Sequence, residues 1–133
     1  PYMSESTLLT DRNREIYLDW SWETTIEMRR SQAVYDRLSR IYYVTDRTIL
    51  RVLDDVNKSQ FLPNADALTS NEVYSWKIFK VLRETYMGGH ELHHVIVGNW
   101  KMADFRTLSE AKHYINNKAK LIQGRLELLK LYE

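Results

Sequence analysis

Between Pro1 and Pro63 the chain contains neither glycine nor proline. Because these two residues are the usual local interrupters of helices, any break in this half must come from helix caps and side-chain chemistry. Apolar residues in the same region recur at intervals of three and four, which is the period of one face of a helix. The sequence therefore predicts an N-terminal region of consecutive helices.

Three helices fit this pattern. The first is expected at about residues 11–28, after a cap at Thr10 or Asp11. The second is expected to follow a cap at Ser31, and the third follows a cap at Thr45. The inward positions of the third helix are apolar residues at helical spacing, namely Ile49, Val52, Leu53 and Val56.

Residues 57–66 are mostly polar and include Pro63, so we expect a linker there. This linker divides the chain into a three-helix unit over residues 1–58 and a second module over residues 59–133. A chain of 133 residues has the length of one ordinary domain or of two very small ones.

The second module is expected to contain a helix, a β-hairpin and a long final helix. Thr69-Ser70-Asn71-Glu72 has the pattern of a capping box, and it precedes a stripe at helical spacing made of Val73, Trp76, Phe79, Lys80, Leu82 and Tyr86. Gly98-Asn99 lies between two β-prone runs and predicts a two-residue hairpin turn. Thr107-Leu108-Ser109-Glu110 is a second capping box and opens the final helix. The predicted fold class is mostly α with one small β-hairpin.

The junction between the second and third predicted helices has the residues of a tight turn. Ser39 is small where the two helices would cross, Val44 buries the turn, and Thr45 caps the next helix. The order Leu38-Ser39, Val44-Thr45 and Thr48-Ile49 resembles the helix-turn-helix family of DNA-binding domains over about residues 31–55. The family prefers glycine where this chain has Tyr43. A left-handed tyrosine there costs about 1 kcal/mol, unless the turn has another geometry, and its ring is an alternative plug for the core.

The resemblance implies a non-catalytic protein that binds double-stranded DNA, with the third helix in the major groove. It assigns contacts with base edges to six residues of that helix and its cap, namely Thr45, Asp46, Arg47, Thr48, Leu50 and Arg51. It assigns contacts with phosphates to residues around the second helix, namely Arg29, Arg30, Ser31 and Arg37. Such a unit occurs in small regulators and in phage-type DNA recognition or packaging subunits.

The distribution of charge is more informative than the net charge of +1. Residues 11–27 carry two arginines and five acids, a net charge of −3, whereas residues 29–51 carry six arginines and two acids, a net charge of +4. A positive segment made of arginine suits phosphates and guanine edges. It also fits a solvated arginine face on an ordinary three-helix core. The alternative function is therefore a structural or assembly protein, such as a coat or adaptor subunit, without base-specific contacts.

His90-Glu91-Leu92-His93-His94 has the H-E-x-x-H spacing of zinc proteases. That chemistry needs a helix, and the apolar run that follows predicts a strand, which would place His90 and His94 about 13 Å apart. We therefore expect neither a metal site nor any other cofactor, and no enzymatic activity. The chain has no cysteine, which excludes disulfides and thiolate zinc sites.

The sequence also gives expectations about partners and location. No apolar run reaches the length of a membrane-spanning helix, so we expect no membrane partner and a location in the cytoplasm, or in the host cytoplasm or virion for a viral protein. The final helix carries more leucine than a small domain needs for its own core. We therefore expect a homo-oligomer.

Overall fold

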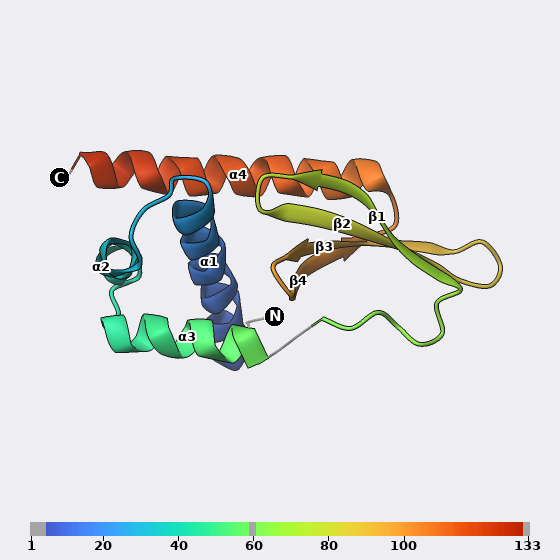
Figure 1. Cartoon of the computed structure of the whole chain (residues 1–133), viewed down its shortest axis with the longest axis horizontal. Coiled ribbons are helices and arrows are strands. Elements are labelled where there is room, and N and C mark those ends of the chain that lie inside the picture. Colours follow the sequence, from blue (N-terminus) through green and yellow to red (C-terminus); the bar gives the residue numbers. More distant parts are fainter. Residues whose placement is uncertain (1–4, 59–60, 132–133) are drawn as a thin grey trace.

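The computed structural model describes residues 5–58 and 61–131. The chain forms three helices, then a four-stranded sheet, then one long helix (Figure 1). The helices are α1 (Glu5–Thr25), α2 (Ser31–Tyr42), α3 (Asp46–Lys58) and α4 (Leu108–Lys130). The strands are β1 (Thr69–Trp76), β2 (Phe79–Thr85), β3 (Glu91–Val97) and β4 (Trp100–Phe105).

The predicted order of the first three helices is confirmed. The Thr48 N–H donates to Thr45 Oγ1 (3.2 Å), which is the predicted cap of α3. The predicted cap at Ser31 is wrong by one residue, because Ser31 is the first residue of α2 and the N-cap is Arg30, which makes no side-chain cap hydrogen bond. All of the predicted inward residues of α3 are buried. The first helix was predicted to start too late, because α1 already includes the expected cap residues Thr10 and Asp11.

The predicted fold class is wrong in the second half of the chain. A small β-hairpin was expected, whereas the structure contains an antiparallel sheet with the strand order β1-β2-β3-β4. The segment predicted as a helix after Thr69 forms β1 and β2 instead. In β2 the burial alternates, with Phe79 and Val81 buried and Lys80 exposed, which is the period of a strand that covers a core.

The turn between β1 and β2 explains this error. Trp76 pairs with Phe79, so Lys77 and Ile78 form a two-residue turn. Lys77 adopts a φ of 55°, a conformation that hairpins usually assign to glycine or asparagine. The turn therefore lacks its usual sequence signal, and the capping-box pattern and the chance helical spacing of the apolar residues favoured a helix.

Two other local predictions in this half are confirmed. Val97 pairs with Trp100 across the turn at Gly98-Asn99, and Gly98 has the positive φ (60°) that the hairpin requires. The Glu110 N–H donates to Thr107 Oγ1 (3.2 Å), so the predicted capping box opens α4.

The core joins both halves of the chain. One cluster of buried side chains includes residues of α1, α2, α3, the sheet and α4. The long helix α4 contacts α1 and α2 at one end and β2, β3 and β4 at the other (Figure 1). The predicted linker falls between α3 and β1, where the described residues from Phe61 onward are irregular up to the strand, and residues 59 and 60 lie outside the described part. No helix among the described residues has both the length and the apolar character needed to cross a bilayer.

Replacing Gly98 by alanine tests the packing of the hairpin turn on α1. A Cβ atom at this position would collide with the hydroxyl of Tyr17, in addition to the strain of a positive φ. We expect Gly98→Ala to lower the free energy of unfolding by about 1–2 kcal/mol through strain and by about a further 1–3 kcal/mol through overpacking. Urea denaturation measures both parts. Gly89→Ala is the control, because Gly89 also has a positive φ but its added Cβ would meet nothing within 4 Å. Equal losses for the two variants would contradict the proposed collision.

Candidate nucleic-acid interface

The turn between α2 and α3 is tight and contains a left-handed residue. Tyr43 has φ 55° and ψ 44°, and its N–H and that of Val44 both reach the Ser39 carbonyl, the latter at 3.2 Å. The Tyr43 ring is 93% exposed. Of the two alternatives for Tyr43, a left-handed residue or a turn of another geometry, the structure has the first, and the prediction that its ring plugs the core is wrong. The cost of about 1 kcal/mol is not recovered by burial of the ring.

Polar side chains hold the start of α3 against α2. The Ser39 hydroxyl contacts both the Tyr35 carbonyl (2.8 Å) and a carboxylate oxygen of Asp46. Gln32 Nε2 donates to the other Asp46 oxygen (3.3 Å). Figure 1 shows α2 almost end-on while α3 lies across the view, so the two helices cross steeply. Asp46 thus acts as a positioning residue between the helices.

The outer face of α3 is open to solvent. Arg47, Leu50 and Arg51 are exposed, with Leu50 at 48%. They occupy one side of the first two turns, opposite the buried residues of the helix. Thr45 is exposed but caps the helix, and Thr48 is half-buried beside it. The structure therefore gathers three of the six predicted base-contact residues on a free surface.

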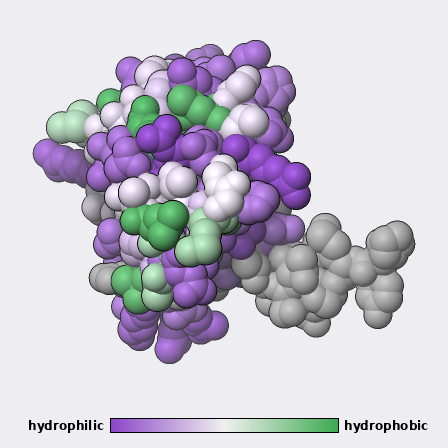
Figure 2. Space-filling model, turned by 90° about the vertical axis from the view of Figure 1, so that its right-hand side faces the viewer, coloured by the Kyte–Doolittle hydropathy of each residue, from purple (hydrophilic) through white to green (hydrophobic). Residues whose placement is uncertain are grey.

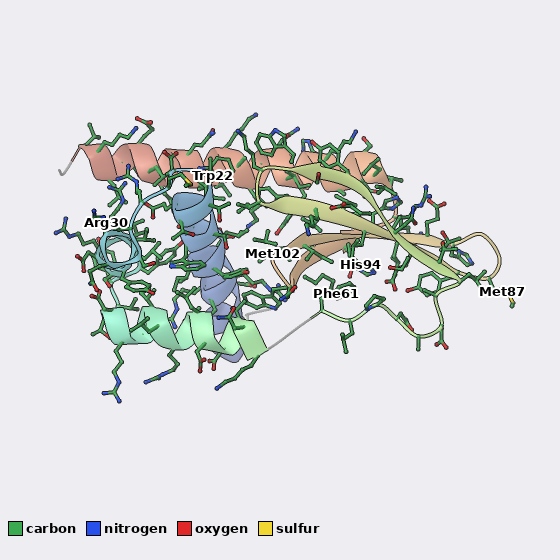
Figure 3. All side chains as sticks on the ribbon, viewed as in Figure 1. Trp22, Arg30, Phe61, Met87, His94 and Met102 are labelled. Atoms are coloured by element: carbon green, nitrogen blue, oxygen red, sulfur yellow. The ribbon has the colours of Figure 1, made fainter. Side chains whose placement is uncertain are left out.

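The four predicted phosphate-contact residues divide into two groups. Arg30 and Ser31 are exposed at the start of α2, and Figure 3 shows Arg30 projecting away from the body of the protein. Arg29 lies 3.6 Å from a carboxylate oxygen of Glu23, and Arg37 lies 2.7 Å from the same oxygen. Arg37 is only 7% exposed. A buried arginine bound to a carboxylate is part of the core and is not positioned for phosphate.

The partners of these arginines belong to an acidic ladder on α1, made of Glu15, Asp19 and Glu23. The three acids are four residues apart and so lie on one face of the helix. Asp19 accepts from Arg125 of α4 at 2.7 and 2.8 Å, and from the Tyr42 hydroxyl of α2 at 2.6 Å. Glu15 pairs with Lys118 and Arg125 of α4. Sequence reasoning missed this ladder, although its four-residue spacing was a readable signal.

Burial dominates the titration of two acids of the ladder, Asp19 and Glu23. It raises the pKa of Asp19 and of Glu23 above their ordinary values, against the opposing effect of Arg125 and Arg37. Glu23 is fully buried. Removal of its cation would therefore leave a carboxylate in a poorly hydrated site.

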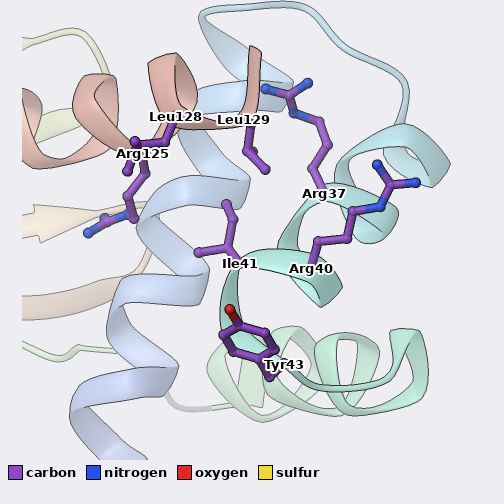
Figure 4. Close-up of a pocket in the computed structure, with 7 residues that line it drawn as sticks. All are labelled: Arg37, Arg40, Ile41, Tyr43, Arg125, Leu128 and Leu129. Carbon is purple, nitrogen blue, oxygen red and sulfur yellow. The ribbon is translucent and has the colours of Figure 1, made fainter. Parts of the chain in front are cut away.

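A pocket of about 470 Å³ lies beside the turn, between α2 and the end of α4 (Figure 4). It is lined by Arg37, Arg40, Ile41, Tyr43, Arg125, Leu128 and Leu129. Arg37 and Arg125 are held by acids of α1, which leaves Arg40 as the cation on its exposed side. Among the described lining residues there is no carboxylate, histidine or hydroxyl other than that of Tyr43, so the pocket has no catalytic set.

The histidine cluster forms part of the sheet. The predicted strand is confirmed, because His93 and His94 belong to β3. His94 Nε2 contacts the carboxylate of Glu84, which is 1% exposed and also accepts from the Asn64 N–H (2.7 Å) and the Tyr86 hydroxyl (3.2 Å). Phe61 packs on His94 with ring centroids 4.9 Å apart (Figure 3). Within the described residues no three His, Asp or Glu side chains are grouped to hold a metal ion.

The described surface at the end of the molecule away from α3 is mixed in character. Figure 2 views the end that carries the β2–β3 turn, where hydrophobic residues form small separate patches among hydrophilic ones. In Figure 1 the β2–β3 turn and α3 lie toward opposite ends of the molecule. The exposed arginines of α3 are therefore the better candidate for recognition.

Comparison of the chain with protein-family models, with curated proteins and with solved structures gives no match. The function must therefore be inferred from the residues and from their geometry.

Tyr43→Gly tests the strain in the turn. Glycine adopts the left-handed conformation without a steric cost, and the exposed tyrosine ring has little packing to lose. We expect the free energy of unfolding to increase by about 1 kcal/mol. Thermal and urea denaturation measure the change, and Tyr43→Ala, which keeps a Cβ, should not show it. A lower stability for Tyr43→Gly would mean that the ring makes contacts that outweigh the strain.

Arg37→Met tests the assignment of Arg37 to the core. The variant leaves Glu23 buried without its nearest cation, so we expect a loss of about 3 kcal/mol at neutral pH. The pKa of Glu23 is already raised by burial and should rise further. A protonated carboxyl needs no cation, so the loss should shrink as the pH falls toward the ordinary pKa of glutamate. The exposed Arg47→Met is the control and should change stability by less than about 0.5 kcal/mol. A loss that is independent of pH would contradict this account.

Proposed function

We propose that this protein binds double-stranded DNA without catalysing a reaction, with α3 lying in the major groove. The observation that carries the proposal is the turn at Tyr43: a left-handed residue, a threonine cap and a steep crossing of α2 and α3. This arrangement presents the start of the second helix outward, as the helix-turn-helix mode of recognition requires.

The exposed residues of α3 suit base edges. Arg47 and Arg51 are one turn apart on the same face, and an arginine recognises guanine through two parallel hydrogen bonds. Leu50 lies between them and fits the methyl group of thymine. Asp46 leaves the set of proposed base contacts, because Ser39 and Gln32 already occupy its carboxylate. Its role is to fix the angle of α3 on α2.

Phosphate contacts in this proposal come from the start of α2. Arg30 and Ser31 are exposed there, and the α2 N-terminus favours an anion because its first N–H groups have no intrahelical acceptor. Arg29 is 30% exposed and only loosely paired, so it stays at the edge of the surface. Arg37 is left out because it is buried.

The near-neutral net charge makes the affinity depend on this one surface. With Arg30 as the proposed phosphate-contact cation, the slope should be about −1 when the logarithm of the binding constant is plotted against that of salt concentration. That slope is small for a DNA-binding protein. Specificity would then depend on α3 more than on general attraction to the duplex.

Arg47→Ala combined with Arg51→Ala tests the proposal. We expect the double variant to lose binding to a 20–30 base-pair duplex pool by at least about tenfold at low salt, with a salt slope changed by less than about one, because the two arginines are proposed to contact bases. Both side chains are exposed, so the thermal midpoint should stay within about 2 °C of the parent. Fluorescence anisotropy over a range of salt concentrations measures both quantities.

The control removes the same charge elsewhere. Arg106→Ala combined with Lys112→Ala lies at the start of α4, far from α3, on exposed residues. This variant should bind the duplex as the parent does. Equal effects of the two double variants would show general attraction without a recognition helix. No binding by the parent at low salt would overturn the proposal and favour the structural or assembly protein.

A further inference from the structure

The outer face of α4 carries a stripe of exposed leucines, on the side of the helix away from the core. The stripe is defined by Asn117, Leu121, Gly124, Leu128 and Leu131, which are spaced four, three, four and three residues apart. Its leucines are 52%, 59% and 77% exposed. The opposite face of the helix is buried in the core. Alternating spacings of three and four are typical of a helix that packs along a second helix.

We infer that this outer stripe is covered by α4 of a second copy of the chain, running antiparallel to the first. Gly124 sits within the stripe, and a Cβ added there would meet nothing within 4 Å. The glycine therefore leaves a gap that a leucine side chain can fill. In the register that places Leu121 over Gly124 of the partner subunit, Leu128 lies over Asn117 of the partner subunit and Leu131 over Tyr114 of the partner subunit.

The surface at the receiving end has a matching hollow. A groove of about 460 Å³ runs beside the first half of α4 and is lined by residues that include Phe105, His113, Tyr114 and Asn117. In the same register the exposed Leu128 and Leu131 of the partner subunit reach this groove. The two-fold symmetry forms the contact twice, which is the usual closed arrangement of a homodimer.

The charges beside the stripe select a second copy and its direction. On one flank Lys118 and Arg125 are already neutralised by Glu15 and Asp19 of α1, so two copies do not repel each other there. On the other flank Lys120 and Glu127 are seven residues apart, and the exposed Glu127 carboxylate also contacts Lys130 of its own helix at 3.3 Å. An antiparallel partner places Lys120 beside Glu127 of the partner subunit, and Glu127 beside Lys120 of the partner subunit. A parallel partner would instead place Lys120 beside Arg125 of the partner subunit, a cation that Asp19 already holds, and would leave Lys120 without an acid across the contact.

This interface is separate from the proposed DNA-binding surface. α3 lies on the opposite side of α1 from α4 (Figure 1), so self-association leaves Arg47 and Arg51 uncovered. Each proposal can therefore fail while the other stands, and both can be measured on the same variants.

The first experiment measures the mass of the full chain in solution by sedimentation equilibrium from about 1 to 200 µM. We expect a concentration-dependent dimer for the parent and a monomer for Leu121→Lys combined with Leu128→Lys. Leu62→Lys combined with Leu68→Lys is the control, since these leucines are 74% and 62% exposed but lie before β1, away from the stripe. The control should remain a dimer. A monomeric parent, or equal dissociation of both variants, overturns the inference.

A charge exchange tests the antiparallel register. Lys120→Glu and Glu127→Lys should each weaken the dimer by about tenfold, because each places like charges side by side in both symmetry-related contacts. The two substitutions together exchange the charges and should restore the parent dissociation constant. Failure of the double variant to recover overturns the antiparallel arrangement. Circular dichroism checks that every variant keeps its helix content, and duplex binding by the monomeric leucine variant keeps the two proposals distinguishable.

Discussion

The fold depends on the acidic ladder of α1. Glu15, Asp19 and Glu23 present one row of carboxylates, and both α2 and α4 contribute groups that reach it. α2 contributes Arg37 and Tyr42, and α4 contributes Arg125 and Lys118. Burying a carboxylate without a cation is costly. If α2 or α4 moved away from α1, an acid of the ladder would remain in a poorly hydrated site without its cation. The ladder therefore fixes the positions of α2 and α4 around α1.

The same ladder changes the meaning of the arginine-rich segment. The arginine-rich segment has a net charge of +4 and lies beside a segment with a net charge of −3. Two of its arginines, Arg37 and Arg29, pair with Glu23 of the acidic segment inside the protein. The exposed arginines of the segment are Arg47 and Arg51 on α3, Arg30 before α2 and Arg40 near the end of α2. The surface available for a polyanion is thus smaller and better defined than the charge of the sequence suggests, because pairing with internal acids removes cations from it.

Local signals in the sequence predicted what local chemistry determines. The cap at Thr45, the capping box at Thr107 and the turn at Gly98 each depend on residues within three or four positions, and each is confirmed. The strand pair at Lys77 and the burial of Arg37 depend on distant partners. Lys77 tolerates a positive φ because β1 and β2 pair along their length, and Arg37 is buried because Glu23 faces it across the helix pair. For the proposed recognition surface, the sequence predicted α3 and its exposed arginines. It did not predict that Arg29 and Arg37, expected to contact phosphates, pair with Glu23 instead.

The placement of α4 has a consequence for how two copies would meet DNA. A dimer through the outer face of α4 places the two α3 helices on its far sides, because α1 separates α3 from α4 in each copy (Figure 1). The two recognition surfaces then face away from each other. They do not lie side by side, one helical turn apart, as the reading of two half-sites on a single duplex requires. Such a dimer is suited to holding two duplex segments, or two distant parts of one duplex, with a single recognition helix on each. The spacing of sites along a duplex is then not set by the α4 contact, and each copy must obtain its specificity from the few side chains on its own α3.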